Sequence, residues 1–149
     1  MDIKNIVEKL INKHNTNCPF KLADKLNIHI LYEPLGATLG YFSRDFRLKF
    51  IHINQNLSTE AQIFVCAHEI GHAILHPDVN TPFLSRHTLF SISKIEREAN
   101  TFAVEFLMPD SLIHDEYECM SLFDIANICG IPPQMAILKT ISKSGQCPA

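Results

Sequence analysis

Apolar residues recur at helical spacing at the start of the chain and form strand-like runs soon afterwards. Residues 2–14 hold five apolar residues at helical spacing and predict a first helix, and a second short helix is expected from about Pro19. From Asn27 the pattern changes to three β-rich runs, which span residues 28–36, 39–45 and 47–54 and are separated by Gly36, Gly40 and a turn at 43–45. These patterns predict an N-terminal helical cap followed by a small antiparallel sheet.

A long helix is expected after the third run, over residues 58–76. Ser58 or Thr59 can cap its first turn, and the pair His76-Pro77 ends it, because a residue that precedes proline avoids the helical conformation. The following residues, 79–92, mix proline, serine and threonine without a clear period. We interpret them as a loop that could lie over a site.

A second long helix is expected from near Ser93. The spacing of Ser93 and Glu96 fits a capping box, and the helix should stop before Pro109. Beyond it, two short helices are expected between residues 121 and 141. The sequence contains no internal repeat and no low-complexity linker. We therefore expect residues 1–149 to form a single α+β domain.

The first long helix carries a His-Glu-x-x-His sequence, formed by His68, Glu69 and His72. His72 is rotated by only about 40° from His68 in a helix, so both imidazoles leave the same face one turn apart and can share a metal. Neutral imidazoles suit zinc, and a neighbouring carboxylate can take a proton from water that the metal activates. The sequence thus predicts a zinc site with His68 and His72 as ligands and Glu69 as general base. Apolar residues fill the opposite arc of the helix: Ile63, Phe64, Ala67, Ile70, Ile74 and Leu75.

Zinc needs a third protein ligand, and the second long helix offers Glu96, Glu98 and Glu105. Glu96 falls inside the apolar, inward arc of this helix, whereas Glu98 and Glu105 lie at its margin. An inward carboxylate is costly unless it is paired or binds a metal, so Glu96 is the preferred ligand and Glu98 the alternative. Asn100 lies one turn on from Glu96, on the same side, and is predicted to orient a ligand histidine through a hydrogen bond.

Two strings of this sequence resemble the ImmA/IrrE metallopeptidases of bacteria, phages and integrative elements. They are HEIGHAILHP and, on the next helix, EREANTFAVEFLMP; the upstream segment GYFSRDFRLKFIHINQNLS is similar to the family's glycine-led hairpin. The resemblance is strongest over about residues 40–109. In the family pattern the third ligand falls on Glu96, and Asn100 matches the residue that supports a histidine in gluzincin peptidases. The resemblance implies a zincin-like domain, with a small antiparallel sheet packed on the metal-binding helix and helical segments at both ends, the C-terminal one over residues 110–149.

The same resemblance implies an intracellular, site-specific zinc endopeptidase whose typical substrate is a helix-turn-helix repressor. We expect an exposed strand within residues 47–53 to hold the substrate by strand addition. The alternative is a non-catalytic protein that keeps the metal and acts by stoichiometric binding, as an anti-repressor or as one component of a paired regulatory system. The intact Glu69 favours the enzyme, because binding alone requires no base.

The composition limits the kinds of partner that the protein is expected to bind. The net charge is −3, and residues 110–141 hold one lysine and no arginine against five acidic residues, which argues against direct binding of nucleic acid. No uncharged stretch reaches the roughly 18 residues needed to span a membrane, and four charges interrupt the first ten residues, unlike a signal peptide. We expect a cytosolic protein without a membrane partner. Its five cysteines form no C-x-x-C pair and are expected to be buried thiols.

Two roles stay open in the sequence. A peptidase of this kind needs a donor that stabilises the tetrahedral oxyanion, and the sequence does not choose among His87, His114 and Tyr117. His76 lies one turn beyond His72. It is either a fourth ligand or, as we prefer, a flanking polar residue near the helix end.

Overall fold

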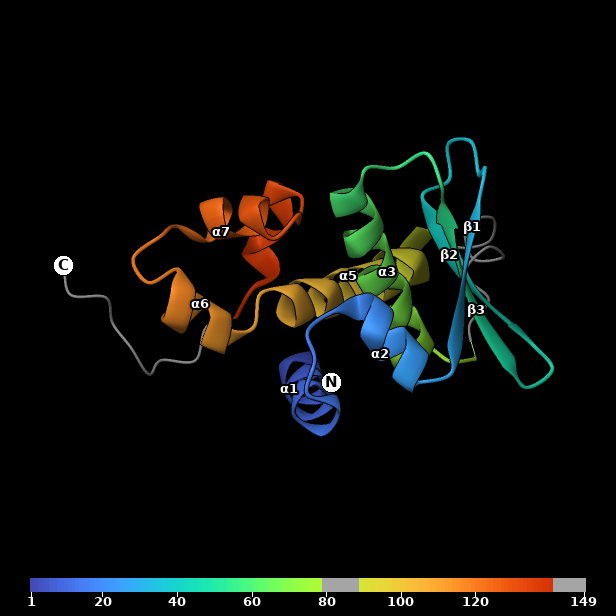
Figure 1. Ribbon diagram of the computed structural model, residues 1–149, viewed down its shortest axis with the longest axis horizontal. Helices are drawn as coiled ribbons and strands as arrows, with labels where there is room; N and C mark the ends of the chain where they lie inside the picture. The colour runs from blue at the N-terminus through green and yellow to red at the C-terminus, as the bar shows by residue number, and fades with distance from the viewer. Residues whose placement is uncertain (79–88, 141–149) are drawn as a thin grey trace.

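Two long helices cross beside a three-stranded sheet, with short helices on either side of the crossing (Figure 1). The computed structural model describes residues 1–78 and 89–140. Within these residues, helices before and after the sheet confirm the α+β class. In chain order the elements are α1 (Ile3–His14), α2 (Pro19–Lys25), β1 (Ile28–Glu33), β2 (Gly40–Asp45), β3 (Leu48–Asn54), α3 (Thr59–Leu75), α5 (Leu89–Leu107), α6 (Asp110–Glu116), α7 (Leu122–Ile128) and the 3₁₀ helix η1 (Pro133–Leu138).

The two long helices follow the local signals of the sequence to different degrees. Ser58 is the N-cap of α3 and accepts a hydrogen bond from the Ala61 N–H, and α3 ends at Leu75 as expected. α5 begins at Leu89, upstream of Ser93, so the predicted start and its capping box are wrong. Residues 89–92 contain neither glycine nor proline, and nothing in them stops the helix. The rest of the predicted loop, residues 79–88, lies outside the described residues.

The sheet is mixed, with strand order β1-β3-β2. β2 pairs with β3 in antiparallel register, whereas β1 pairs with β3 in parallel register. The predicted antiparallel sheet is therefore wrong for β1. The chain crosses from β1 to the far edge of the sheet before it enters β2, and two reversals of direction leave β3 parallel to β1.

The central position of β3 also removes the predicted substrate strand. Residues 48–54 pair on both sides, so β1 and β2 are the edges of this sheet. The turn between β2 and β3 falls at Phe46 and Arg47 rather than at residues 43–45, which belong to β2. Phe46 adopts a φ of 55°, in the left-handed region.

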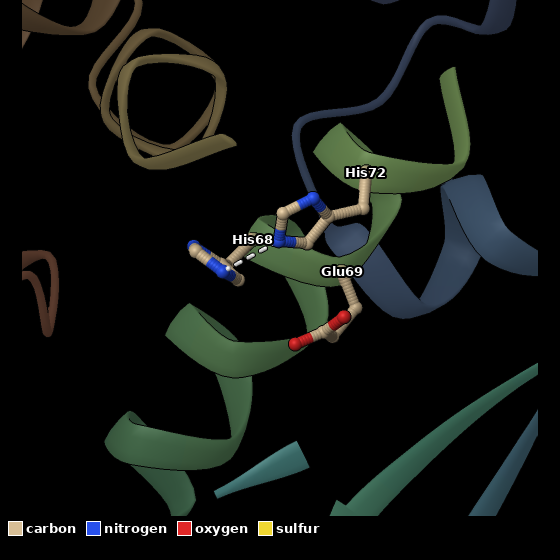
Figure 2. A group of neighbouring side chains, drawn as sticks. All are labelled: His68, Glu69 and His72. Atoms are coloured by element: carbon tan, nitrogen blue, oxygen red, sulfur yellow. Dashed lines mark hydrogen bonds between the residues drawn. The ribbon is translucent and has the colours of Figure 1, made fainter. Parts of the chain in front are cut away.

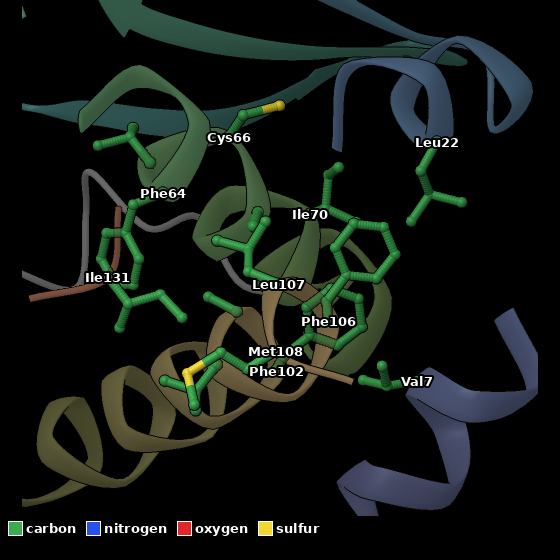
Figure 3. Close-up of a cluster of buried hydrophobic side chains, with 14 of the residues drawn as sticks. Val7, Leu22, Phe64, Cys66, Ile70, Phe102, Phe106, Leu107, Met108 and Ile131 are labelled. Carbon is green, nitrogen blue, oxygen red and sulfur yellow. The ribbon is translucent and has the colours of Figure 1, made fainter. Parts of the chain in front are cut away.

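α3 is the central helix and presents different chemistry on its two sides. His68, Glu69 and His72 leave one side of it (Figure 2). The other side packs into the main hydrophobic core, in which Ile70 and Cys66 are fully buried (Figure 3). Cys66 is a free thiol whose pKa burial raises, as fits the predicted packing role.

α3 and α5 approach closely at Gly71. A Cβ atom at this position would lie 3.1 Å from the Cβ of Phe102 and 3.2 Å from the Cα of Ala99. The absence of a side chain at Gly71 therefore lets the two helices touch. The crossing brings the first half of α5 alongside the histidines of α3.

The C-terminal segment continues from the end of α5. α6 was not predicted, and the second of the two expected C-terminal helices is the 3₁₀ helix η1. Cys18 and Cys129 are free thiols, but Cys119 is disulfide-bonded and exposed, so the expectation of a buried thiol is wrong there. No helix among the described residues is long and apolar enough to cross a membrane.

Candidate metal centre and active site

The rings of His68 and His72 face each other one turn apart on α3. Their Nε2 atoms are 3.0 Å apart, and the rings meet edge to face with centroids 4.7 Å apart. Glu96 reaches both from α5: one carboxylate oxygen lies 3.2 Å from the Nε2 of His68 and the other lies 3.2 Å from the Nε2 of His72. Two nitrogens and a carboxylate thus converge on one point.

This donor set fits a divalent metal ion. Around a tetrahedral zinc with bonds of about 2.05 Å, neighbouring ligand atoms are about 3.3 Å apart, which is close to the separations between His68, His72 and Glu96. Without a cation, two facing nitrogens can satisfy each other only if one is protonated and the other is not. His68, Glu69 and His72 also form a group whose ligand atoms lie within 4.8 Å of one another.

The electrostatics of the three converging residues are coupled. Burial by itself would raise the pKa of the Glu96 carboxyl, but the hydrogen bonds and charges of His68 and His72 outweigh burial and hold this pKa below its usual range. Burial lowers the pKa of His72. Burial also acts to lower the pKa of His68, but Glu96, Glu69 and Asn100 together raise it. An ionised carboxylate therefore faces one ring that is held neutral, the form in which imidazole binds metals.

Glu69 lies beside the converging atoms and is buried. Burial raises the pKa of its carboxyl to about 7, even though nearby His68 and a hydrogen bond from the backbone N–H of Phe42 act in the opposite direction. Its Oε2 atom is buried and has no hydrogen-bond partner among the described residues. Glu69 lines the same cleft as the histidines, so a carboxylate oxygen without a partner lies beside them and can accept a proton.

Asn100 lies behind His68, one turn of α5 beyond Glu96. Its side-chain Oδ1 is 2.8 Å from the Nδ1 of His68. Because an amide oxygen only accepts, Nδ1 carries the proton and the Nε2 of the neutral ring is left with a lone pair directed at Glu96. This is the contact predicted for Asn100.

The other two glutamates of α5 are engaged elsewhere. Glu98 lies 2.8 Å from the Nε2 of His76, and Glu105 lies 2.6 Å from the amino group of Lys139. The side chain of Glu96 is 46% exposed, against 15% for Glu98 and 2% for Glu105, so the prediction that Glu96 is the inward residue is wrong. Glu96 differs from Glu98 and Glu105 because it lies beside the rings of both His68 and His72. Its angular position on the helix did not reveal this.

The cleft in front of this cluster has a volume of about 630 Å³. Of the donors considered for the oxyanion, His114 and Tyr117 do not line it, and His87 lies outside the described residues. His76 pairs with Glu98, and its ring centroid lies 6.2 Å from that of His72. The lining is formed by Leu35, Thr38, Leu39, Gly40, Tyr41, Phe64, Val65, His68, Glu69, His72, Glu96, Asn100 and Met135.

Several cleft residues were not found from the sequence. Gly40 starts the edge strand β2, and a Cβ atom there would lie 2.6 Å from a side-chain carbon of Val65 and 2.7 Å from the backbone oxygen of His52. The glycine therefore allows β2 to lie against α3 and to bring the Phe42 N–H to Glu69. An isolated glycine at a strand end is the signal that pointed to such a close approach. No local signal marks Leu35, Leu39 or Met135.

Comparisons with known proteins agree with this geometry. Residues 23–125 match the peptidase family M78, described as the IrrE N-terminal-like domain. A protein of Bacillus phage phi105, described as uncharacterized immunity region protein 2, is 45% identical over 143 residues, which cover 95% of this chain and 90% of that protein. Metallopeptidase ImmA of Bacillus subtilis (strain 168) is 35% identical over 115 residues, or 76% of this chain and 67% of that protein. The resemblance inferred from the sequence is thereby confirmed.

Proposed function

Because the chain belongs to the IrrE N-terminal-like family of M78 metallopeptidases, we propose that it is a zinc endopeptidase that cleaves a regulatory protein at a specific site. The observation that carries this proposal is the convergence of His68, His72 and Glu96 beside a buried Glu69 with a free carboxylate oxygen. In this proposal the first three residues hold the metal and Glu69 is the general base.

Zinc is proposed from the ligand types, because two imidazoles and one carboxylate suit it and leave a fourth position open in a catalytic site. When bound, zinc would supply a Lewis acid that polarises the scissile carbonyl and makes water more acidic. Asn100 holds His68 in the tautomer that ligates the metal. In these assignments His68, His72 and Glu96 hold the metal, and Asn100 positions one of the ligands.

Glu69 performs the proton transfers. The Phe42 N–H fixes one end of its carboxylate, and the free Oε2 takes a proton from the attacking water and later delivers it to the leaving amine. Burial sets its pKa at about 7, so the base is increasingly ionised as the pH rises through neutrality. A bound zinc ion would lower this pKa, so we expect the acid limb of the activity at or below pH 7.

The edge strand β2 replaces residues 47–53 as the proposed substrate strand. Gly40 and Tyr41 line the cleft, and the backbone of Phe42 contacts Glu69. The Phe42 N–H of this strand is already bound to Glu69, so an extended segment of the substrate would pair with β2 beside Gly40 and Tyr41 and would pass the catalytic carboxylate. The sheet would then position one peptide bond through backbone hydrogen bonds alone.

The proposed substrate is a helix-turn-helix repressor in the cytosol. The family resemblance implies this class of substrate, and the name of the phage relative, an immunity region protein, agrees with a regulatory role. The described part of the chain has no helix that could carry it across a membrane, and its net charge of −3 does not favour DNA as a direct partner.

Co-expression with the helix-turn-helix protein encoded beside the gene tests the proposal. We would compare wild type, Glu69→Gln and the matched control Glu98→Gln, follow the size of the partner by mass spectrometry, and measure bound metal in all three. Fragments are expected with wild type and Glu98→Gln but not with Glu69→Gln, which should keep its zinc. An intact partner that is bound and inactivated equally by all three proteins would instead identify a stoichiometric antagonist.

A further inference from the structure

The cleft has a polar end and an apolar end. The polar end holds the converging histidines and glutamates, whereas the apolar end is lined by Leu35 and Leu39 before β2, by Phe64 on α3 and by Met135 on η1. Leu39 is 57% exposed, although exposure of a large aliphatic side chain to water is unfavourable. An apolar surface is thus kept open to solvent within reach of the metal centre.

The two ends are continuous. The prediction that Phe64 lies on the arc opposite the histidines is wrong: Phe64 is one turn before His68 on the same face of α3, and the centroids of their rings are 6.2 Å apart. A substrate chain whose scissile bond lies at His68 therefore places a neighbouring side chain against Phe64. Phe64, in the apolar end, is therefore close enough to His68 for neighbouring residues of one substrate chain to contact both.

Both walls of the apolar end are held in place. Asn54 donates hydrogen bonds to the backbone oxygens of Gly36 (2.9 Å) and Thr38 (3.0 Å) and so pins the segment that carries Leu35 and Leu39. On the opposite side, Lys139 follows η1 directly and binds Glu105 at 2.6 Å. These bonds fix the two walls independently of any ligand.

The C-terminal wall also packs on the core. Ile131, just before η1, belongs to the same buried cluster as Phe64 (Figure 3). Lys139 lies 2.8 Å from Asp110 as well, and the Thr140 N–H donates to Glu105 at 2.9 Å. Helix α5, which carries Glu96 and Asn100, therefore also carries Glu105, the residue that holds the end of η1 and with it Met135.

We propose that the apolar end is a specificity subsite that takes a large apolar side chain of the substrate next to the scissile bond, with Met135 as its determining residue. This inference rests on the proposed peptidase function. A charged side chain placed there would lose water, and among the described residues that line the cleft the charged groups are His68, Glu69, His72 and Glu96, at the metal end. The flexible thioether of Met135 adapts to leucine, isoleucine, phenylalanine or methionine side chains.

Methyl NMR tests binding independently of cleavage. The chain has four methionines, and Met108, in the core, and Met120, outside the cleft, serve as internal controls. The probes are N-acetylated, C-amidated alanine tetrapeptides with one leucine, phenylalanine or aspartate. Leucine and phenylalanine peptides should shift the Met135 methyl signal saturably and leave the two controls in place. An unmoved Met135 signal, or an equal shift with the aspartate peptide, overturns the inference.

Cleavage of a proteome-derived peptide library by the zinc-loaded protein gives the second readout. Wild-type cleavage sites should be enriched in large apolar residues at one position beside the scissile bond. Met135→Ala should lower kcat/KM for the best of these peptides by about tenfold, mainly through KM, since this is the low end of the effect of an apolar contact in a pocket. Met135→Leu should restore most of the loss, and the control Met120→Ala should match wild type.

The possible outcomes distinguish failure of the proposed subsite from failure of the proposed peptidase function. Cleavage without an apolar preference, or equal preference in Met135→Ala and Met120→Ala, overturns the subsite and leaves the peptidase function in place. A wild-type protein that binds zinc but cleaves neither the library nor the neighbouring repressor overturns the peptidase function itself.

Discussion

Two charged clusters each take one glutamate from α5, Glu96 in one and Glu105 in the other, and they differ in whether every charged group has a partner of opposite charge. The metal cluster is the proposed ligand set of His68, His72 and Glu96, and the lysine cluster consists of Lys4, Glu105, Asp110 and Lys139. In the lysine cluster each carboxylate has an amino group within 2.9 Å. In the metal cluster one carboxylate faces two titratable rings whose nitrogens point at each other.

The difference shows why burial alone does not identify a metal ligand. Glu105 is far more buried than Glu96, but the amino group of Lys139 lies 2.6 Å from its carboxylate and satisfies it. Glu96 is half-exposed, and its partners are imidazoles that accept a metal in their neutral form. A carboxylate among titratable rings indicates a binding site, whereas a carboxylate among lysines indicates a structural anchor.

The largest effect is expected from Glu96→Ala. Bound zinc should fall from one ion per chain to near zero, and cleavage should fall by more than about 100-fold, because loss of even an orienting partner costs about 10–100-fold. Metal analysis and a cleavage assay measure the two effects. The control Glu98→Ala should keep both the metal and the activity. Retained zinc in Glu96→Ala together with its loss in Glu98→Ala would reverse the ligand assignment.

Lys139→Met should instead act on stability. It leaves the buried Glu105 carboxylate without its cation, and breaking a buried pair in this way costs about 3–5 kcal/mol of the free energy of unfolding. Urea unfolding measures this loss, and the folded fraction should still bind zinc. The double variant Lys139→Met/Glu105→Gln should recover most of the stability. Equal instability of the single and double variants would show that charge pairing is not the cause.

A smaller effect is expected from Asn100→Ala. His68 would lose the acceptor that fixes its tautomer, and the affinity for zinc should fall by about 10–100-fold while the stoichiometry stays the same. Competition with a chelating dye measures the affinity, and Asn100→Asp, which keeps an acceptor, should bind zinc nearly as wild type does. Unchanged affinity in Asn100→Ala would remove Asn100 from the centre.

The smallest effect is expected from Lys4→Ala. Lys4 and Asp110 are partly exposed, and Asp110 keeps its contact with Lys139, so the free energy of unfolding should fall by at most about 1 kcal/mol. Urea unfolding beside the exposed control Lys9→Ala resolves such a difference. A loss as large as that of Lys139→Met would mean that the lysine cluster acts as one unit rather than through its buried pair.

The local part of the fold could be predicted from the sequence. The Ser58 cap, the end of α3 and the i, i+4 spacing that puts His68 and His72 on one face depend on residues close together in the chain. Features of this kind depend on residues that are close together in the chain, so they can be predicted from the local sequence.

The sequence by itself thus determined the secondary structure of most elements, the histidine face of α3 and the family. Only the tertiary structure decided the mixed order of the sheet, the edge position of β2, the pairing of Glu105 with Lys139, and the place of Met135 in the cleft. The physical reason is that periodicity records which face of an element is buried, but not which distant segment covers it. Contacts of that range depend on how the chain crosses from one element to the next.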